Sequence, residues 1–335
     1  MEIASEEKVR KDPLLNKILS EVGEALGLAN RESERVKEQI ILNRESLFKK
    51  IENLETPPRK LIAYIARYGN PKSGITPDDI APIGSMLQNI GTVEYLDLII
   101  HSPGGSGVTS EKIVDMCRKH CTKEFRVIVP NMAKSAATMI ALGSDAIVMG
   151  YCSELGPIDA QTTILVSGVP QQISVQSFID ARRNLLNDLH GAKAKGQEFV
   201  GYLQQLTAST MEPAFINECE REIRFAIDLV KKWLPENMLK VKYPKESLKR
   251  RRLKANTIAK NLSSANTRFT HGRMISIDEC QKIGLNVIEL KKEDTFWNLL
   301  WELYVRAEVF MMINSKENQQ TSKLFMDANS HLLAF

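Results

Sequence analysis

The chain has 335 residues, of which 43% are hydrophobic and 26% are charged, so it is long enough to bury a substantial core. Its 45 basic and 41 acidic residues leave a formal charge of +4, a balance that argues against a protein whose whole surface binds nucleic acid. The five cysteines, with no secretory leader in view, argue against a disulfide scaffold.

The location of the protein is predicted from its apolar segments. No stretch reaches 18 consecutive apolar residues, and the amino terminus MEIASEEKVRKD is polar where a signal peptide needs an apolar run. We therefore expect a cytoplasmic protein without a membrane span and without a nucleic acid partner.

The first predicted unit, residues 1–57, is a helical extension. Four apolar residues have the spacing of one buried helical stripe: Ile18, Val22, Leu26 and Leu28. Pro57-Pro58 interrupts this pattern, because proline removes a backbone donor and clashes with the preceding turn.

From residue 58 the patterns of strands and helices alternate, which indicates an α/β fold with mostly parallel sheets and crossover helices. The predicted elements are strands at 61–68, 96–102, 125–130 and 146–150, and helices at 75–91, 108–120 and 136–143. A hairpin is expected at 164–174, where two β-rich runs flank a glycine and a proline.

The predicted domain covers residues 58–292 and includes a helical insertion at about 175–265, with a long amphipathic helix at 211–234. Residues 275–290 read as a helix, a glycine stop and a closing strand. Residues 293–335 are expected to form a C-terminal helical and apolar extension that packs on the domain or on a second subunit.

Two further features have competing interpretations. Residues 245–254 (KESLKRRRLK) carry six basic side chains and one acid, so they form either a solvated helix face or a contact for an acidic partner. Cys117, His120 and Cys121 lie within about one helical turn, but no second cluster completes a metal site. We expect no metal and no cofactor.

The motif SPGGSG (102–107) follows a predicted strand. Gly104 and Gly105 lack Cβ atoms, so the backbone can turn sharply there and present an N–H group. Acyl transfer needs such a donor for the oxygen that becomes negative, together with a nucleophile and a base. A Gly-Gly pair after a strand is equally compatible with an ordinary turn.

Ser135 follows a strand and a short linker, at the expected amino end of a helix. Unpaired N–H groups at this position favour developing negative charge, which suits a nucleophilic serine. The alternative is that Ser135 only caps the helix with its hydroxyl group.

Four motifs occur together in order: LDLIIHSPGG, VPNMAKSAATMIALGSDAIVMG, LGPIDAQ and THGRMISIDECQKIGLNVIEL. From about 60 to 162, and again at 270–290, the chain thereby resembles the ClpP and signal-peptide-peptidase superfamily of serine peptidases. It resembles most closely the branch called serine dehydrogenase proteinases. The resemblance implies a ClpP/crotonase-like fold, a peptidase that cleaves peptide or protein substrates, and a homo-oligomer built from trimers.

Carried over by position, the resemblance implies Ser135 as the nucleophile. It also implies an oxyanion hole made by the N–H groups of Gly105 and Ala136, with Gly104 in the same turn. The histidine of ClpP falls at or near Pro157 here, so a standard ClpP triad is excluded.

The base has two candidate sources. The serine dehydrogenase proteinase branch uses Ser, Asp and His in that chain order, which implies Asp159 as the orienting acid and His271 as the base. Asp159 also suits a Gly-Pro-x-Asp turn with no catalytic role. The signal peptide peptidases use a lysine, for which Lys193 and Lys195 are the candidates here.

Two other classes of function stay open. One is a catalytically inert member of the fold that serves as an assembly or interaction module. The other is an acyl-CoA enzyme of the crotonase type, against which the serine at position 135 argues. His101, at the end of a predicted strand, is interpreted as structural.

Overall fold

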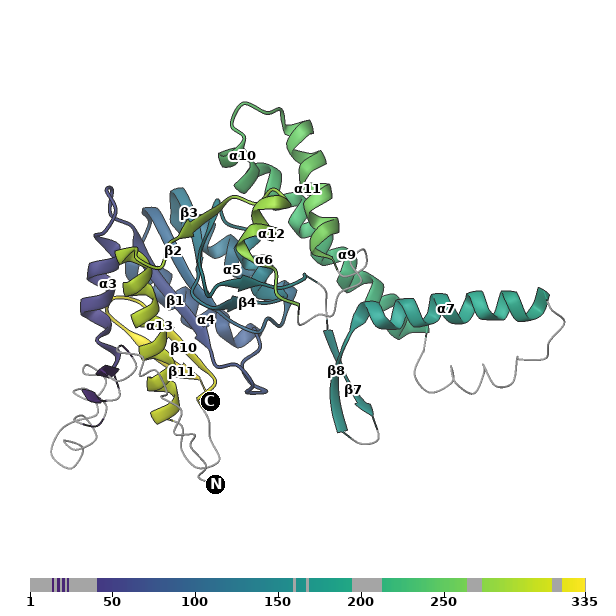
Figure 1. The fold of residues 1–335 in the computed structure, drawn as a ribbon, viewed down its shortest axis with the longest axis horizontal. Coiled ribbons are helices and arrows are strands. Elements are labelled where there is room, and N and C mark those ends of the chain that lie inside the picture. The colour runs from purple at the N-terminus through teal and green to yellow at the C-terminus, as the bar shows by residue number, and fades with distance from the viewer. Residues whose placement is uncertain are drawn as a thin grey trace, which may run out of the picture.

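One seven-stranded sheet forms the centre of the fold (Figure 1). The computed structural model describes residues 14, 17, 18, 20, 21, 23, 41–158, 161–166, 169–194, 213–263, 273–314 and 321–334. The strands of this sheet are β1 (Lys60–Ala66), β2 (Val93–His101), β3 (Cys121–Val129), β5 (Ala146–Gly150), β9 (Val287–Leu290), β10 (Lys323–Met326) and β11 (His331–Ala334). Their order is β11-β10-β1-β2-β3-β5-β9; only β10 and β11 are antiparallel to their neighbours. The predicted α/β fold with a mostly parallel sheet is confirmed.

Alternate residues of the central strands face two different helix layers. In β2, Leu98 and Ile100 belong to one hydrophobic core, whereas Ile99 belongs to the other. The buried parts of these strands are mostly apolar because helices cover both faces of the sheet. The first layer contains the short 3-10 turn η2 (Pro77–Asp79), α4 (Ile80–Ile90), α5 (Gly107–His120) and α6 (Ala136–Leu142). The second contains α3 (Arg44–Glu52) and α13 (Thr295–Ile313).

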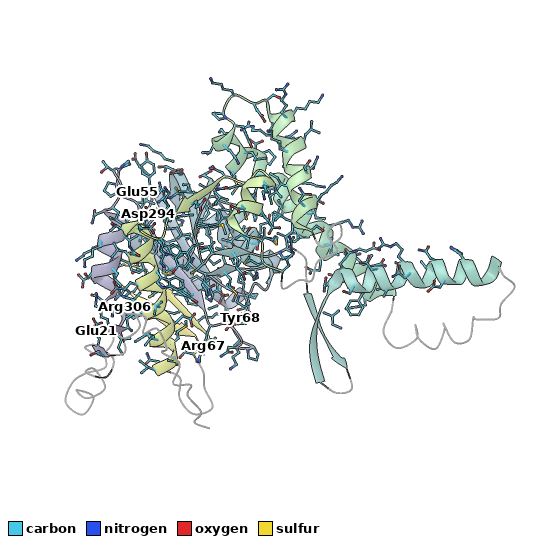
Figure 2. All side chains as sticks on the ribbon, viewed as in Figure 1. Glu21, Glu55, Arg67, Tyr68, Asp294 and Arg306 are labelled. Atoms are coloured by element: carbon cyan, nitrogen blue, oxygen red, sulfur yellow. The ribbon has the colours of Figure 1, made fainter. Side chains whose placement is uncertain are left out.

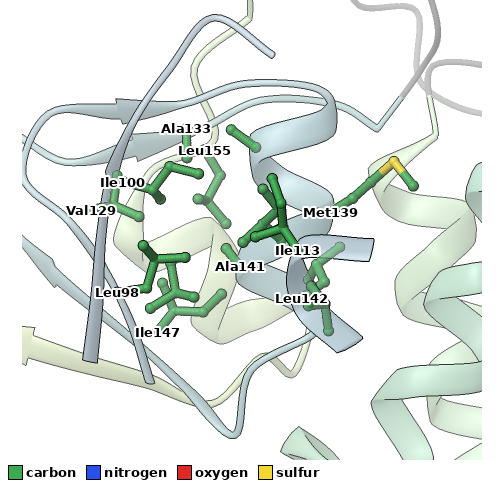
Figure 3. Packing of buried hydrophobic residues seen from close by; sticks show 14 of the residues in the cluster. Leu98, Ile100, Ile113, Val129, Ala133, Met139, Ala141, Leu142, Ile147 and Leu155 are labelled. Carbon is green, nitrogen blue, oxygen red and sulfur yellow. The ribbon is translucent and has the colours of Figure 1, made fainter. Parts of the chain in front are cut away.

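Figure 3 shows the first core where α5 and α6 meet the sheet. Ile113 of α5 and Leu142 of α6 lie close to Leu98 and Ile147 of the strands, and all four side chains are fully buried. Burying one such side chain contributes about 1.5–3 kcal/mol. This packing fixes the position of α6, the helix that begins immediately after Ser135.

A smaller sheet crosses the carboxyl ends of the central strands. It pairs β4 (Met132–Ala133) with β6 (Glu154–Leu155). Isolated bridges extend it from Ser102 to Ala133 and from Leu155 to Ile275. These two-residue strands are absent from the sequence prediction because two residues carry no periodic pattern.

The described residues after β6 begin with the hairpin of β7 (Gln161–Val166) and β8 (Val169–Ser174). The helices that follow are α7 (Val175–Ala194), α9 (Pro213–Glu236), α10 (Met238–Lys242), α11 (Leu248–Leu262) and α12 (Ile277–Lys282). In Figure 1, α7 projects away from the central sheet. The predicted hairpin and the long helix predicted at 211–234 are confirmed, with bounds shifted by a few residues.

Residues 293–335 contribute both a helix and strands of the central sheet. Residues 293–335 were expected to be helical and apolar, and α13 agrees, but β10 also enters the sheet beside β1, with Ala63 opposite Met326. Four-residue strands bearing a lysine give too weak a pattern to predict. Among the described helices, none combines the length and the apolar character needed to cross a membrane.

An arginine of α13 links this helix to the amino-terminal part of the chain. Arg306 is almost fully buried and contacts Glu21 at 2.7 Å and the carbonyl oxygen of Ile41 at 3.0 Å (Figure 2). Ile18 of the predicted amino-terminal stripe is also fully buried, while Val22, Leu26 and Leu28 lie outside the described residues.

Candidate active site

Two turns meet at the carboxyl ends of the neighbouring strands β2 and β3. The first contains Gly104 and Gly105, and the second contains Ser135. The Ser102 N–H group donates to Met132 O at 3.1 Å, and the Lys134 N–H group donates to Ser102 O at 3.1 Å. These two bonds hold the glycine turn directly beside the serine turn.

Gly104 is in contact with the serine turn. A Cβ atom on Gly104 would lie 2.6 Å from Lys134 O, 2.7 Å from Ser135 Cβ and 3.2 Å from Ala136 N. Its φ of 104° is also one that other residues rarely adopt. Glycine is therefore required here so that the two turns can approach each other.

Gly105 packs against the backbone of Ile75, where a Cβ atom would clash with Ile75 N. The Ile75 N–H group donates to Gly104 O at 2.7 Å, and the Ser106 N–H group donates to Ile75 O at 2.8 Å. In this parallel arrangement the N–H group of Gly105 itself points away from Ile75. It donates to no other group within the described residues, so it can serve a ligand.

Ser135 has an uncommon backbone conformation. Its φ of 49° and ψ of −115° lie outside the regions that non-glycine residues normally occupy. Although Ser135 occupies the N-cap position of α6, its side chain makes no capping hydrogen bond. The interpretation of Ser135 as a simple helix cap is therefore wrong.

The first amide of α6 is also available. Ala136 is buried, and its N–H group has no acceptor within the described residues. Helix formation begins one residue later, where the Ala137 N–H group donates to Lys134 O at 2.9 Å. The Gly105 and Ala136 amides thus lie on the two turns that Gly104 brings together.

Lys134 anchors the serine turn to two other segments. The side chain is buried and its Nζ lies 2.6 Å from Glu154 Oε1, 3.4 Å from Leu155 O and 3.3 Å from Arg273 O. Glu154 and Leu155 form β6, while Arg273 lies just before α12. No sequence pattern points to these partners of Lys134, because they come from distant parts of the chain.

This region is similar to a known protein family. Residues 74–180, which include both turns, match the family described as ClpP-like SDH-type serine proteinase. Residues 74–180 are thus similar to the serine proteinases of this family. The resemblance to serine dehydrogenase proteinases, and the ClpP-like fold that it implies, are confirmed.

Two uncharacterized proteins of Methanocaldococcus jannaschii have similar sequences. One is 30% identical over 230 residues, which make up 69% of this chain and 65% of that protein. The other is 42% identical over 66 residues, or 20% of this chain and 22% of that protein. The chain thus covers less than two thirds of the length of either relative.

A solved structure of the membrane-bound stomatin-specific protease 1510-N is also similar. Its TM-score is 0.36 and its sequence identity 15%, over 68% of this chain and 79% of that chain.

The predicted partners of Ser135 are not among the residues the structure places. Asp159, His271 and Lys195 lie outside the described residues. The nearest described neighbours are Ile158, whose N–H group donates to Leu262 O at 2.9 Å, and Arg273, whose carbonyl oxygen contacts Lys134. The residue before Asp159 and the residue two positions after His271 are therefore both hydrogen-bonded to the body of the protein.

Lys193 belongs to the last turn of α7. A helix of this length extends about 30 Å, and Figure 1 shows that α7 leads away from the sheet. Within one chain, the last turn of α7 therefore does not lie beside Ser135.

His101, the strand-end histidine next to the glycine turn, faces α13. The Met132 N–H group donates to its Nδ1 at 3.3 Å, which leaves the proton on Nε2, 3.7 Å from Glu308 Oε1. The Tyr304 ring packs against the imidazole at 4.9 Å. Burial lowers the pKa of His101 to about 4, so the ring is neutral at pH 7. These contacts agree with the structural role predicted for His101.

Glu308 shares this environment. Burial raises its pKa to about 7, an effect that the nearby Arg67 opposes.

Among the described residues, no group of three or more His, Cys, Asp or Glu side chains converges to hold a metal ion.

Proposed function

We propose that this chain is a serine peptidase that cleaves peptide bonds through an acyl-enzyme on Ser135. The observation that carries this proposal is the close approach of Gly104 to Ser135, beside the amides of Gly105 and Ala136, which have no acceptor in the part of the chain that the structure describes. Paired N–H donors beside a strained serine form the arrangement that stabilises a tetrahedral oxyanion.

In the proposed reaction, Ser135 Oγ bonds to the scissile carbonyl carbon while its proton moves to a base. The carbonyl oxygen takes up the electron pair and accepts hydrogen bonds from the Gly105 and Ala136 amides. Collapse of this intermediate expels the amine, which leaves with the proton from the base. A water molecule then hydrolyses the ester with the help of the same base.

We assign the base to His271 and its orientation to Asp159. Asp159 directly follows Ile158, and His271 is two residues before Arg273. Because Lys134 contacts both β6 and Arg273, the segments that carry these residues begin close to the serine turn. In this arrangement the carboxylate would hold the imidazole tautomer that can accept the serine proton.

A lysine base is the weaker alternative. The course of α7 leads Lys193 away from the site within one chain, so a Ser-Lys dyad with Lys193 would need a second copy. The trimer-based homo-oligomer implied by the family resemblance stays part of the proposal, as do the peptide or protein substrate and the cytoplasmic location.

The test is labelling of the purified chain by a fluorophosphonate probe, which reacts with activated serines. We expect labelling of the wild type and its complete loss in Ser135→Ala. The control is Ser247→Ala, which removes a hydroxyl group that caps α11 by accepting from the Arg250 N–H group at 3.4 Å. Labelling that persists in Ser135→Ala would refute the assignment, and a wild type that never reacts would favour the inert module.

His271→Asn and Lys193→Met then distinguish the bases. With His271 as the base, His271→Asn lowers the labelling rate by at least about 10³-fold, while Lys193→Met leaves it unchanged. The opposite pattern would assign the base to the lysine.

A further inference from the structure

The chain from residue 237 to residue 263 is strongly basic. It contains nine lysines and arginines and a single acidic residue, Glu246. Lys260, near the end of α11, is exposed and has no acidic partner within the described residues. The same holds for five basic side chains closer to the turn before α11: Lys240, Lys245, Lys249, Arg250 and Arg252. We call these five residues of α10, α11 and the turn between them the basic surface.

On two other exposed helices, a lysine has an acidic partner one turn away. On α3, Lys49 lies 2.7 Å from Glu45, and on α5, Lys119 lies 2.7 Å from Asp115. In the basic region, Glu246 is already engaged by Lys254 at 3.1 Å. The charge of the basic surface is thus left for a partner.

The basic surface also exposes apolar side chains. α11 buries Ala255, Ile258, Ala259 and Leu262 against the body of the protein. Leu253, on the opposite side among Lys249, Arg250 and Arg252, is 60% exposed, and Val241 of α10 is 47% exposed. In Figure 1, α10, α11 and their connecting turn extend beyond the edge of the sheet, so a flat partner can reach them.

We infer that the basic surface binds the anionic face of a phospholipid membrane, with Leu253 and Val241 entering the headgroup region. Clustered lysines and arginines are attracted to acidic headgroups, and apolar side chains among them gain free energy by leaving water at the acyl boundary. A nucleic acid would use the cations but offers exposed leucine and valine no comparable gain. This inference does not depend on the proposed peptidase activity.

The experiment is co-sedimentation of the full chain with vesicles of phosphatidylcholine alone or with about 30% phosphatidylserine. We expect binding only to the acidic vesicles, with affinity falling as salt increases. The combined variant Lys249→Glu, Arg250→Glu and Arg252→Glu should weaken this binding by at least about tenfold.

The matched control carries the same change in net charge elsewhere. Lys50→Glu, Lys72→Glu and Lys112→Glu alter three exposed lysines outside the basic surface. This combined variant should bind acidic vesicles within about twofold of the wild type. Thermal unfolding midpoints of both combined variants establish that the comparison is between folded proteins.

Leu253→Ser separates a membrane from another polyanion. We expect it to weaken vesicle binding several-fold without changing retention on duplex DNA. Equal vesicle binding by the two combined variants would overturn the inference. So would tighter binding to DNA than to vesicles together with no effect of Leu253→Ser, which would reassign the basic surface to nucleic acid.

Discussion

The two ends of the central sheet differ in how many of their polar groups have hydrogen-bond or ion-pair partners. At the amino end, Asp97 of β2 accepts from Arg59 Nε at 2.8 Å and from Arg126 Nη2 at 2.6 Å. The same arginines reach Glu124 at 2.6 Å and Glu55 at 3.0 Å; Figure 2 labels Glu55. Two buried guanidinium groups thus have three carboxylates around them.

At the carboxyl end, the backbone is bent into uncommon conformations and leaves donors unused. Gly104, Gly105 and Ser135 all have positive φ values, and the amides of Gly105 and Ala136 have no acceptor within the described residues. Saturated groups stabilise a fold, whereas strained backbone and open donors tend to occur where a ligand binds. The difference predicts that substitutions at one end change stability and those at the other change chemistry.

The largest effect is expected for Gly104→Ala. The added Cβ would meet Lys134 O and Ser135 Cβ at 2.6 and 2.7 Å, so the two turns must separate. We expect the rate of fluorophosphonate labelling to fall by about 10³-fold, as for loss of an oxyanion donor.

Gly69→Ala is the control for Gly104→Ala. Gly69 also has a positive φ, of 83°, but a Cβ there meets no atom within 4 Å. It should lose about 1 kcal/mol of unfolding free energy and keep its labelling rate. Equal labelling by the two alanine variants would show that the contact with Ser135 is unimportant.

At the other end of the sheet, Asp97→Asn should act on stability. The substitution keeps the shape of the side chain but removes the charge shared by Arg59 and Arg126, which are almost fully buried. We expect a loss of roughly 3 kcal/mol of unfolding free energy, measured by urea denaturation. Labelling per folded molecule should stay within about twofold; a large fall in labelling without destabilisation would break the contrast between the two ends.

A smaller effect on chemistry is expected for Lys134→Met, which keeps the length of the side chain and removes its three polar contacts. The serine turn then loses its connection to Glu154 and Arg273, so the base is held less well. We expect the labelling rate to fall by about 10- to 100-fold.

The control for Lys134→Met is Lys123→Met, which breaks a pair with Glu94 at 2.9 Å whose side chains are 54% and 58% exposed. Exposed pairs contribute little, so labelling should not change. Rates that fall equally in both methionine variants would contradict a specific role for Lys134.

The sequence predicted the parts of the site that depend on local patterns. Gly104, Gly105 and Ser135 each follow a strongly apolar strand, so their position at the carboxyl end of a parallel sheet could be expected. The contacts of Lys134 with Glu154 and Arg273 could not, because no spacing in the chain relates these residues. Whether Ser135 caps its helix was likewise open until the torsion angles and hydrogen bonds were known.

The pairing of β10 with β1 affects how the chain folds during synthesis. β1 is apolar on both faces. Among the described residues its outer edge is covered by β10, which lies far along the chain, with Ala63 beside Met326. At about 5–20 residues per second, a ribosome needs roughly 15–50 seconds to make the intervening chain. During that time the edge of β1 stays open, and an exposed apolar edge can pair with other chains. The short strand β10 therefore closes a site of aggregation only after the whole intervening chain has been made.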